Sequence, residues 1–238
     1  MIWLFDLDNT LHNASFSIFP KISENMNAYF AEKYGEEGKM LTSEEADRLR
    51  IDFWKRFGAT LLGVSRVYDQ NARNFLERAH RFEDLDSMIY AERGLAALFR
   101  RLPGRKILLT NSANRYSKEV LGIMGLLPFF DSHISIESMR VHGKLEPKPS
   151  RKFLRKLLTR EKVRPSECIL VEDNSHILKE AKSVGIRTVL VTQYLNASRD
   201  SRDAYPVVQR KVPFSRPRYV DLKISSVRQL SRRLNRIH

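Results

Sequence analysis

The chain has 238 residues, of which 42% are hydrophobic and 29% are charged. This balance allows a packed core and excludes bulk disorder, and no apolar run approaches the roughly 20 residues that a membrane span needs. The single cysteine, Cys168, excludes an intrachain disulfide and suits a reducing compartment. The first apolar run starts at residue 2 and leaves no room for a signal peptide, so we expect a soluble, cytoplasmic protein.

The net charge is +14, and it is concentrated near the carboxyl end of the chain. Residues 198–238 hold eleven Lys and Arg residues against three Asp and Glu residues. A strong positive charge favours anionic partners, which range from phosphate esters to nucleic acids. Either a nucleic-acid-binding segment or a solvated basic surface fits this composition.

Five apolar runs have strand character, namely residues 2–5, 106–110, 134–136, 169–171 and 188–191. Amphipathic patterns between the later runs predict helices at residues 112–125, 149–160 and 175–185. Strands that alternate with helices of this length are typical of a parallel sheet covered on both faces. We therefore predict an α/β protein with a doubly wound, Rossmann-like core.

The segment that follows the first strand breaks this rhythm. Residues 20–35, 42–58 and 71–82 read as amphipathic helices, and the letters TSEE at 42–45 form a capping-box signature. Residues 57–64 (FGATLLGV) read either as a flexible part facing the active site or as a turn between helices. We predict a discontinuous core of residues 1–12 and 90–238, and an all-helical cap of residues 13–89.

The end of the chain is less regular. Residues 197–218 lack periodicity and hold three prolines, which predicts a long loop. Residues 219–224 resemble an edge strand. Residues 225–237 resemble a last helix in which Val227, Leu230 and Leu234 face inward.

Two acids, Asp6 and Asp8, follow directly after the first strand. Two ionised carboxylates so close together repel each other and lose hydration, unless a cation lies between them or one acid acts chemically beside the other. Ligands of open parallel sheets bind beyond the carboxyl ends of the strands, and oxygen ligands suit Mg²⁺. A plain turn at Asp8, Asn9 and Thr10 is the alternative.

Other polar residues stand at the ends of the later strands or in nearby loops. Thr110, Asn111 and Ser112 can hold phosphoryl oxygens, and Lys148 lies between two prolines that stiffen its loop. Glu172 and Asp173 follow another buried strand. These positions predict a single crevice that holds all of these groups.

Four motifs, taken together, resemble the haloacid dehalogenase-like hydrolase superfamily. They are Asp6-Leu7-Asp8-Asn9-Thr10, Thr110 in LLTNS, Lys148 in PKP, and Glu172-Asp173 in VEDN. The resemblance covers residues 1–10 and 90–192, and the helical segment between the first two motifs resembles the cap of many members.

The resemblance implies a role for each matching residue. Asp6 is expected to be the nucleophile, Asp8 the general acid and base, Thr110 a phosphoryl ligand, and Lys148 the cation that orients Asp6. Mg²⁺ is expected on the Asp6 carboxylate, the Asp8 backbone carbonyl and Asp173, with Glu172 binding directly or through water. An Asp at position 8 favours phosphate esters over haloacids as substrates.

Within the superfamily, the first motif, the helical segment and LLTNS look most like bacterial pyrimidine 5′-nucleotidases. This implies a Mg²⁺-dependent phosphatase acting on nucleoside 5′-monophosphates, with Asn111 and Ser112 near the substrate. Relatives often carry an Asn near position 177, where this chain has Ile177. The alternatives are a sugar-phosphate phosphatase or phosphomutase on the same core, and a nucleic-acid-binding protein that uses residues 198–238.

Overall fold

The computed structural model describes residues 1–35, 39–57, 59–67, 72–195 and 215–233. In this part of the chain, six strands form a parallel sheet in the order β3-β2-β1-β6-β7-β8. Their bounds are β1 Ile2–Phe5, β2 Arg105–Leu109, β3 Ser132–Ile134, β6 Cys168–Glu172, β7 Arg187–Val191 and β8 Leu222–Ile224. A separate antiparallel hairpin pairs β4 (Arg140–Val141) with β5 (Lys144–Leu145).

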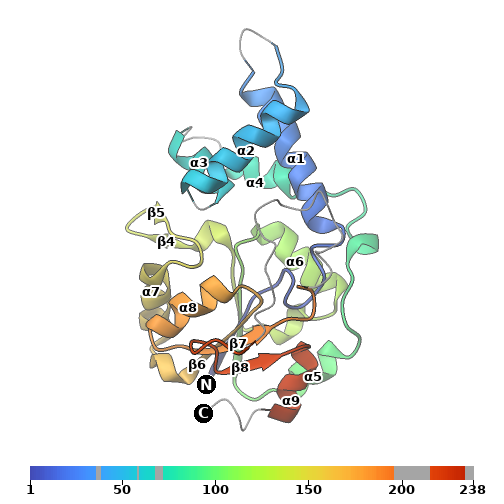
Figure 1. Ribbon diagram of the computed structural model, residues 1–238. Coiled ribbons are helices and arrows are strands. Elements are labelled where there is room, and N and C mark those ends of the chain that lie inside the picture. Colours follow the sequence, from blue (N-terminus) through green and yellow to red (C-terminus); the bar gives the residue numbers. More distant parts are fainter. Residues whose placement is uncertain (36–38, 58, 68–71, 196–214, 234–238) are drawn as a thin grey trace.

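Helices cover both faces of the sheet, which confirms the predicted doubly wound core (Figure 1). One face packs on α5 (Leu95–Arg101), α6 (Asn114–Ile123) and α9 (Leu230–Arg233), and the other on α7 (Arg151–Glu161) and α8 (Ser175–Ser183). Side chains of a strand alternate between faces, so Trp3 and Phe5 of β1 join the first layer while Ile2 and Leu4 join the second.

Local sequence signals set the ends of the core helices. The hydroxyl of Ser150 caps α7 by accepting a hydrogen bond from the backbone N–H of Phe153, and the Asn174 side chain caps α8 in the same way. Gly185 follows α8 with a φ of +89°, a conformation that few other residues adopt. The apolar face predicted for residues 149–160 is buried, as expected from its spacing.

Four helices between β1 and β2 lie above the carboxyl ends of the strands (Figure 1). They are α1 (Ile18–Lys33), α2 (Ser43–Phe57), α3 (Thr60–Val67) and α4 (Ala72–Ala79). Buried aromatic rings of Phe30, Phe53 and Phe75 pack between them. The expected capping box is present, since Thr42 and Glu45 exchange hydrogen bonds.

Residues 57–64 were predicted as a flexible part facing the active site or as a turn between helices. Neither form is correct, because α3 begins at Thr60, but Ala59, Thr60 and Leu61 do line the cavity described below. Glycine weakens a helix, which hid α3 in the sequence. A glycine is needed at position 63 for a steric reason, because a Cβ atom there would lie 2.5 Å from the Phe53 ring. The glycine therefore allows α2 and α3 to pack closely.

Strand β8 forms one edge of the sheet, as predicted for residues 219–224, and Val227 and Leu230 are buried. Most of the predicted loop at 197–218 and the predicted inward position of Leu234 lie outside the described residues. The strand predicted at 134–136 lies two residues earlier, because Ile136 begins a short 3₁₀ turn. Among the described residues, no helix combines the length and apolarity needed to cross a membrane.

Candidate active site

Three adjacent strands at the centre of the sheet, β2, β1 and β6, carry the predicted motifs at their carboxyl ends. Asp6 follows β1, Thr110 follows β2, and Glu172 and Asp173 stand at the end of β6. Lys148 joins them from the loop between β5 and α7. All five residues line one cavity, so the parallel register brings together groups that are far apart in the sequence.

Lys148 is the central charge of this cluster. Its Nζ donates hydrogen bonds to Asp6 Oδ1 at 2.6 Å and to Glu172 Oε2 at 2.8 Å. Burial alone would lower the pKa of Lys148, but the flanking carboxylates of Asp6 and Glu172 raise it above its ordinary value. The ammonium is therefore positively charged and fixes the orientation of Asp6.

The carboxyl groups of the cluster outnumber this positive charge. Burial and the charge of Glu172 raise the pKa of Asp6 to about 7, although Lys148 opposes the shift. Burial raises the pKa of Glu172 to about 7 as well, with Lys148 lowering it and Asp173 raising it. The cluster therefore needs additional positive charge if all of its carboxyl groups are to ionise.

A divalent cation fits this need. Asp6, Glu172 and Asp173 are all buried, and each offers a carboxylate oxygen that lies within 4.8 Å of the others. Hard oxygen ligands of this kind suit Mg²⁺. The three carboxylates are thus able to hold the ion.

Asp8 lies in a different environment from Asp6. Its Oδ1 is 2.9 Å from His12 Nε2 and accepts a hydrogen bond from the Tyr116 hydroxyl at 2.7 Å, while its Oδ2 accepts one from Ser112. Burial would raise the pKa of Asp8, but these hydrogen bonds outweigh it and lower the pKa. The structure therefore shifts the pKa values of the two acids of the first motif in opposite directions.

Asn111 and Ser112 line the cavity, but their polar atoms are occupied within the protein. The Asn111 amide donates to the backbone carbonyl of Lys148 and accepts from its backbone N–H, both at 2.9 Å. The Ser112 hydroxyl donates to Asp8. Asn111 thus holds the lysine loop against β2, and Ser112 helps to orient Asp8.

The cavity extends from the acidic cluster to the four helices above it and has a volume of about 690 Å³. The helices contribute a mainly apolar wall, composed of Phe19, Ile22, Met26, Trp54, Ala59, Leu61, Phe75 and Leu76, with Thr60 and His80 among them. Among the described residues that line the cavity, Lys148 alone carries a Lys or Arg side chain. The cavity therefore joins a charged floor to an uncharged upper wall.

Two residues that hold Asp8 were not predicted as site residues. His12 is fully buried, and its position just after the first motif indicated packing more strongly than an approach to the substrate. Tyr116 comes from α6, 108 positions from Asp8, and nothing in its local sequence indicates that contact. Both belong to the site through the fold alone.

Comparisons with known proteins agree with this geometry. A model of the haloacid dehalogenase-like hydrolase family matches residues 2–185. Pyrophosphatase PpaX of Halalkalibacterium halodurans is 27% identical over 191 residues, which are 79% of this chain and 81% of that protein. The family match spans most of the chain and includes all four motifs, so the chain belongs to the haloacid dehalogenase-like hydrolases.

Solved structures share the fold over nearly the whole chain. A HAD phosphatase from Thermococcus onnurineus has a TM-score of 0.61 at 19% identity and covers 98% of this chain and 97% of its own. CbbY from Rhodobacter sphaeroides, solved in complex with phosphate, has a TM-score of 0.60 at 19% identity and covers 96% and 95% of the two chains.

Proposed function

We propose that this chain is a Mg²⁺-dependent phosphatase that hydrolyses nucleoside 5′-monophosphates, with a preference for pyrimidine nucleotides. The observation that carries the proposal is the single cavity in which an acid and lysine cluster lies beneath a wall of apolar and aromatic side chains. Asp6, Glu172 and Asp173 would hold the ion, together with the backbone carbonyl of Asp8. When bound, Mg²⁺ offsets the repulsion between an anionic nucleophile and an anionic phosphoryl group.

The first half of the reaction uses Asp6 as the nucleophile. A bond forms between an Asp6 carboxylate oxygen and phosphorus while the ester bond breaks, and the leaving oxygen takes a proton from Asp8. Lys148, 2.6 Å from Asp6, aims the carboxylate and offsets phosphoryl charge. Thr110 lies at the adjacent strand end, where its hydroxyl can contact a phosphoryl oxygen.

The second half of the reaction releases phosphate. Asp8 takes a proton from water, the water oxygen bonds to phosphorus, and the bond to Asp6 breaks. The three hydrogen bonds that lower the pKa of Asp8 favour its ionised form, which is the form that this step requires. A substrate that binds as the phosphate monoanion brings the proton that the first half uses.

The upper wall selects the leaving group. Trp54, Phe19 and Phe75 offer aromatic surface on which a flat, uncharged base can pack. A volume of about 690 Å³ accommodates a nucleoside as well as its phosphate. An apolar wall above a phosphate site thus supports an ester whose alcohol is neutral and partly aromatic.

A second anionic group on the substrate, with a charge beyond that of the transferred phosphoryl group, fits this cavity poorly. Asp6, Asp8, Glu172 and Asp173 already give the described floor an excess of negative charge, and the described wall supplies no Lys or Arg to bind another anion. Inorganic pyrophosphate and the sugar bisphosphate that a phosphomutase needs both carry such a charge. We therefore favour nucleoside monophosphates as substrates over pyrophosphate, which the name of PpaX indicates, and over the sugar bisphosphate of a phosphomutase.

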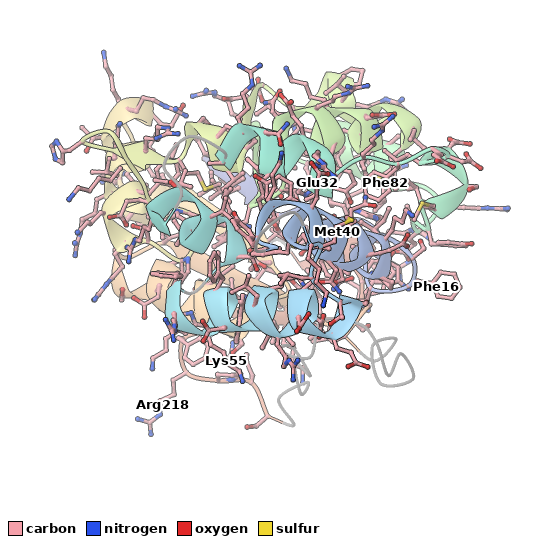
Figure 2. All side chains as sticks on the ribbon, turned by 90° about the horizontal axis from the view of Figure 1, so that it is seen from above. Phe16, Glu32, Met40, Lys55, Phe82 and Arg218 are labelled. Atoms are coloured by element: carbon pink, nitrogen blue, oxygen red, sulfur yellow. The ribbon has the colours of Figure 1, made fainter. Side chains whose placement is uncertain are left out.

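Residues 13–89 would close over the bound substrate as a cap. Its two connections to the core are joined to each other, since the Asn13 N–H donates to the Tyr90 carbonyl at 2.8 Å and the Ser17 hydroxyl to the Met88 carbonyl at 2.9 Å. Phe16 projects outward from this junction at the edge of the molecule and packs edge-on against Tyr90 (Figure 2). Two connections that are joined in this way can act as a hinge. The cap would open on this hinge to admit substrate and close to exclude water.

The test is phosphate release from a panel of esters by the purified chain with Mg²⁺. We expect UMP, dUMP and CMP to be hydrolysed faster than AMP, ribose 5-phosphate, phosphoglycolate or pyrophosphate. Chelation of the metal and the substitution Asp6→Asn should each abolish the activity.

Faster turnover of ribose 5-phosphate or pyrophosphate than of every nucleotide would overturn the substrate assignment. Activity that survives in Asp6→Asn would overturn the nucleophile. Salt-sensitive binding of DNA or RNA that is lost when residues 198–238 are removed, with no phosphatase activity, would support the nucleic-acid-binding alternative instead.

A further inference from the structure

His80 stands directly after α4 and lines the cavity, close enough to Asp8 for the charge of that acid to influence its ring. Its ring packs at a tilt of 46° against the Tyr116 ring, with a centroid separation of 5.2 Å, and the Tyr116 hydroxyl donates a hydrogen bond to Asp8 at 2.7 Å. The imidazole is thus one aromatic ring away from the acid that would serve the leaving oxygen. A leaving alcohol in this cavity would therefore have His80 among the side chains around it.

A second contact of His80, with the backbone of Leu76, determines which ring nitrogen carries the hydrogen. Nδ1 lies 3.0 Å from the backbone carbonyl oxygen of Leu76, which can only accept, so Nδ1 carries the hydrogen. Burial lowers the pKa of His80, although Leu76 and Asp8 oppose the shift, and this favours the neutral ring. Nε2 is then an acceptor, and it is the ring nitrogen left for a molecule in the cavity.

The part of the cavity wall that the described helical residues form has few polar groups, so His80 is one of few side chains there that can form a hydrogen bond with a ligand. Apart from His80, Thr60 is the polar side chain that the described part of α2, α3 and α4 contributes to the cavity. The Thr60 hydroxyl is buried and has no hydrogen-bond partner among the described residues. The described wall therefore offers few hydrogen-bonding groups to a ligand, and His80 is one of them.

We propose that His80 determines specificity by accepting, at Nε2, a hydrogen bond from a hydroxyl group of the leaving alcohol close to the ester oxygen. The proposal rests on the phosphatase function above and deepens it, because the sugar hydroxyls of a nucleotide are the first donors beyond its ester oxygen. A site that hydrogen-bonds a substrate hydroxyl discriminates strongly against an analogue that lacks it. His80 would therefore select sugar-like alcohols over plain alkyl ones.

The experiment compares two pairs of esters that differ in hydroxyl groups, UMP with 2′,3′-dideoxyuridine 5′-monophosphate and glycerol 1-phosphate with propyl phosphate. We expect kcat/KM of the native chain to favour the hydroxylated member by about tenfold to a hundredfold, the cost of leaving one buried acceptor unpaired. In His80→Phe, which keeps a ring but removes the acceptor, each ratio should fall to within about threefold of unity. His80→Gln, whose Oε1 can accept in place of Nε2, should retain most of the ratio.

Three outcomes would overturn the proposal: no preference in the native chain, an unchanged ratio in His80→Phe, or an equal loss on both members of a pair. If circular dichroism shows that His80→Phe is unfolded, His80→Leu takes its place. The second pair contains no base, so it tests His80 even if neither nucleotide is hydrolysed. That result would reject the nucleotide assignment while leaving the role of His80 to be decided by glycerol 1-phosphate and propyl phosphate.

Discussion

The Lys148 ammonium lies 2.6 Å from the Asp6 carboxylate although 142 positions separate the two residues. The pair depends on the sheet, because Asp6 directly follows the central strand β1. The side chain of Asn111, just after the neighbouring β2, holds the lysine loop by two hydrogen bonds to the backbone of Lys148. A buried carboxylate beside a buried ammonium is well oriented, and its orientation costs nothing further when substrate arrives. The fold therefore prepares the nucleophile in advance.

Lys148→Met should lower kcat by about a hundredfold to a thousandfold, because the substitution removes the charge that orients Asp6 and offsets the phosphoryl group. The measurement is phosphate release from UMP at saturating substrate and Mg²⁺. Lys152→Met is the matched control, since Lys152 is an exposed lysine on the neighbouring helix α7. Comparable activity in the Lys148 and Lys152 variants would contradict this role.

The position of the site could be predicted because it follows from a rule of parallel sheets. Asp6, Thr110, Glu172 and Asp173 each stand at a strand end, and such ends meet at one edge once the strands pair in parallel. The contacts among these groups could not be predicted in the same way. The Asn111 amide turns toward the Lys148 backbone, a contact that depends on the path of a loop 37 positions away.

Tyr116→Phe should lower kcat for UMP by about tenfold with little change in KM, because it removes one of the hydrogen bonds that fix Asp8. The loss should be smaller with p-nitrophenyl phosphate, whose leaving group needs no proton. Tyr90→Phe, at an exposed tyrosine, provides the control. An equal loss with both esters would mean that Tyr116 supports the structure rather than proton transfer by Asp8.

The helices and strands that could be predicted are those with a strong local pattern of apolar residues in the sequence. The core strands and α7 have continuous apolar runs or clear faces, so their burial could be expected from spacing alone. Helix α3 was missed because Gly63 lowers helix propensity, while the reason for that glycine is contact with Phe53 on another helix. Tertiary packing overrode the local signal there.

Asp221→Asn should destabilise the protein at neutral pH by about 1–2 kcal/mol. Asp221 directly precedes the edge strand β8 and connects it to the core. Its carboxylate accepts hydrogen bonds from Lys182 Nζ at 2.6 Å and from the Thr188 N–H at 2.8 Å. Burial would raise the pKa of Asp221, but these hydrogen bonds lower it below the ordinary 3.8. Its stabilisation is therefore present above pH 3.8 and lost as the pH falls toward the lowered pKa.

The measurement for Asp221 is the free energy of unfolding in urea at pH 7 and at about pH 3. The difference between the native chain and the variant should shrink at the lower pH. Asp86→Asn, at an exposed aspartate, serves as the control. A difference that is constant with pH would show that the carboxylate charge of Asp221 does not contribute.

Trp54→Ala should raise KM for UMP by about tenfold, because the indole ring lines the cavity and offers a face for the base. It should change KM for ribose 5-phosphate, which has no base, by less than about twofold. The neighbouring Lys55 points away from the body of the molecule, so Lys55→Ala is the matched control (Figure 2). Equal effects on the two substrates would place the base elsewhere in the cavity.

Mg²⁺ should raise the free energy of unfolding by about 2–3 kcal/mol at a concentration near one hundred times its Kd, because it binds the folded carboxylate cluster. Asp173→Asn removes one of three grouped carboxylates, so it should abolish most of this increment. The same substitution should leave the metal-free protein as stable as the native chain or more so, since the charge of Asp173 opposes the ionisation of the buried Glu172. Thermal unfolding with and without Mg²⁺ measures both effects, with Asp52→Asn at a partly exposed aspartate of α2 as the control. A full Mg²⁺ increment in Asp173→Asn would place the ion away from Asp6, Glu172 and Asp173.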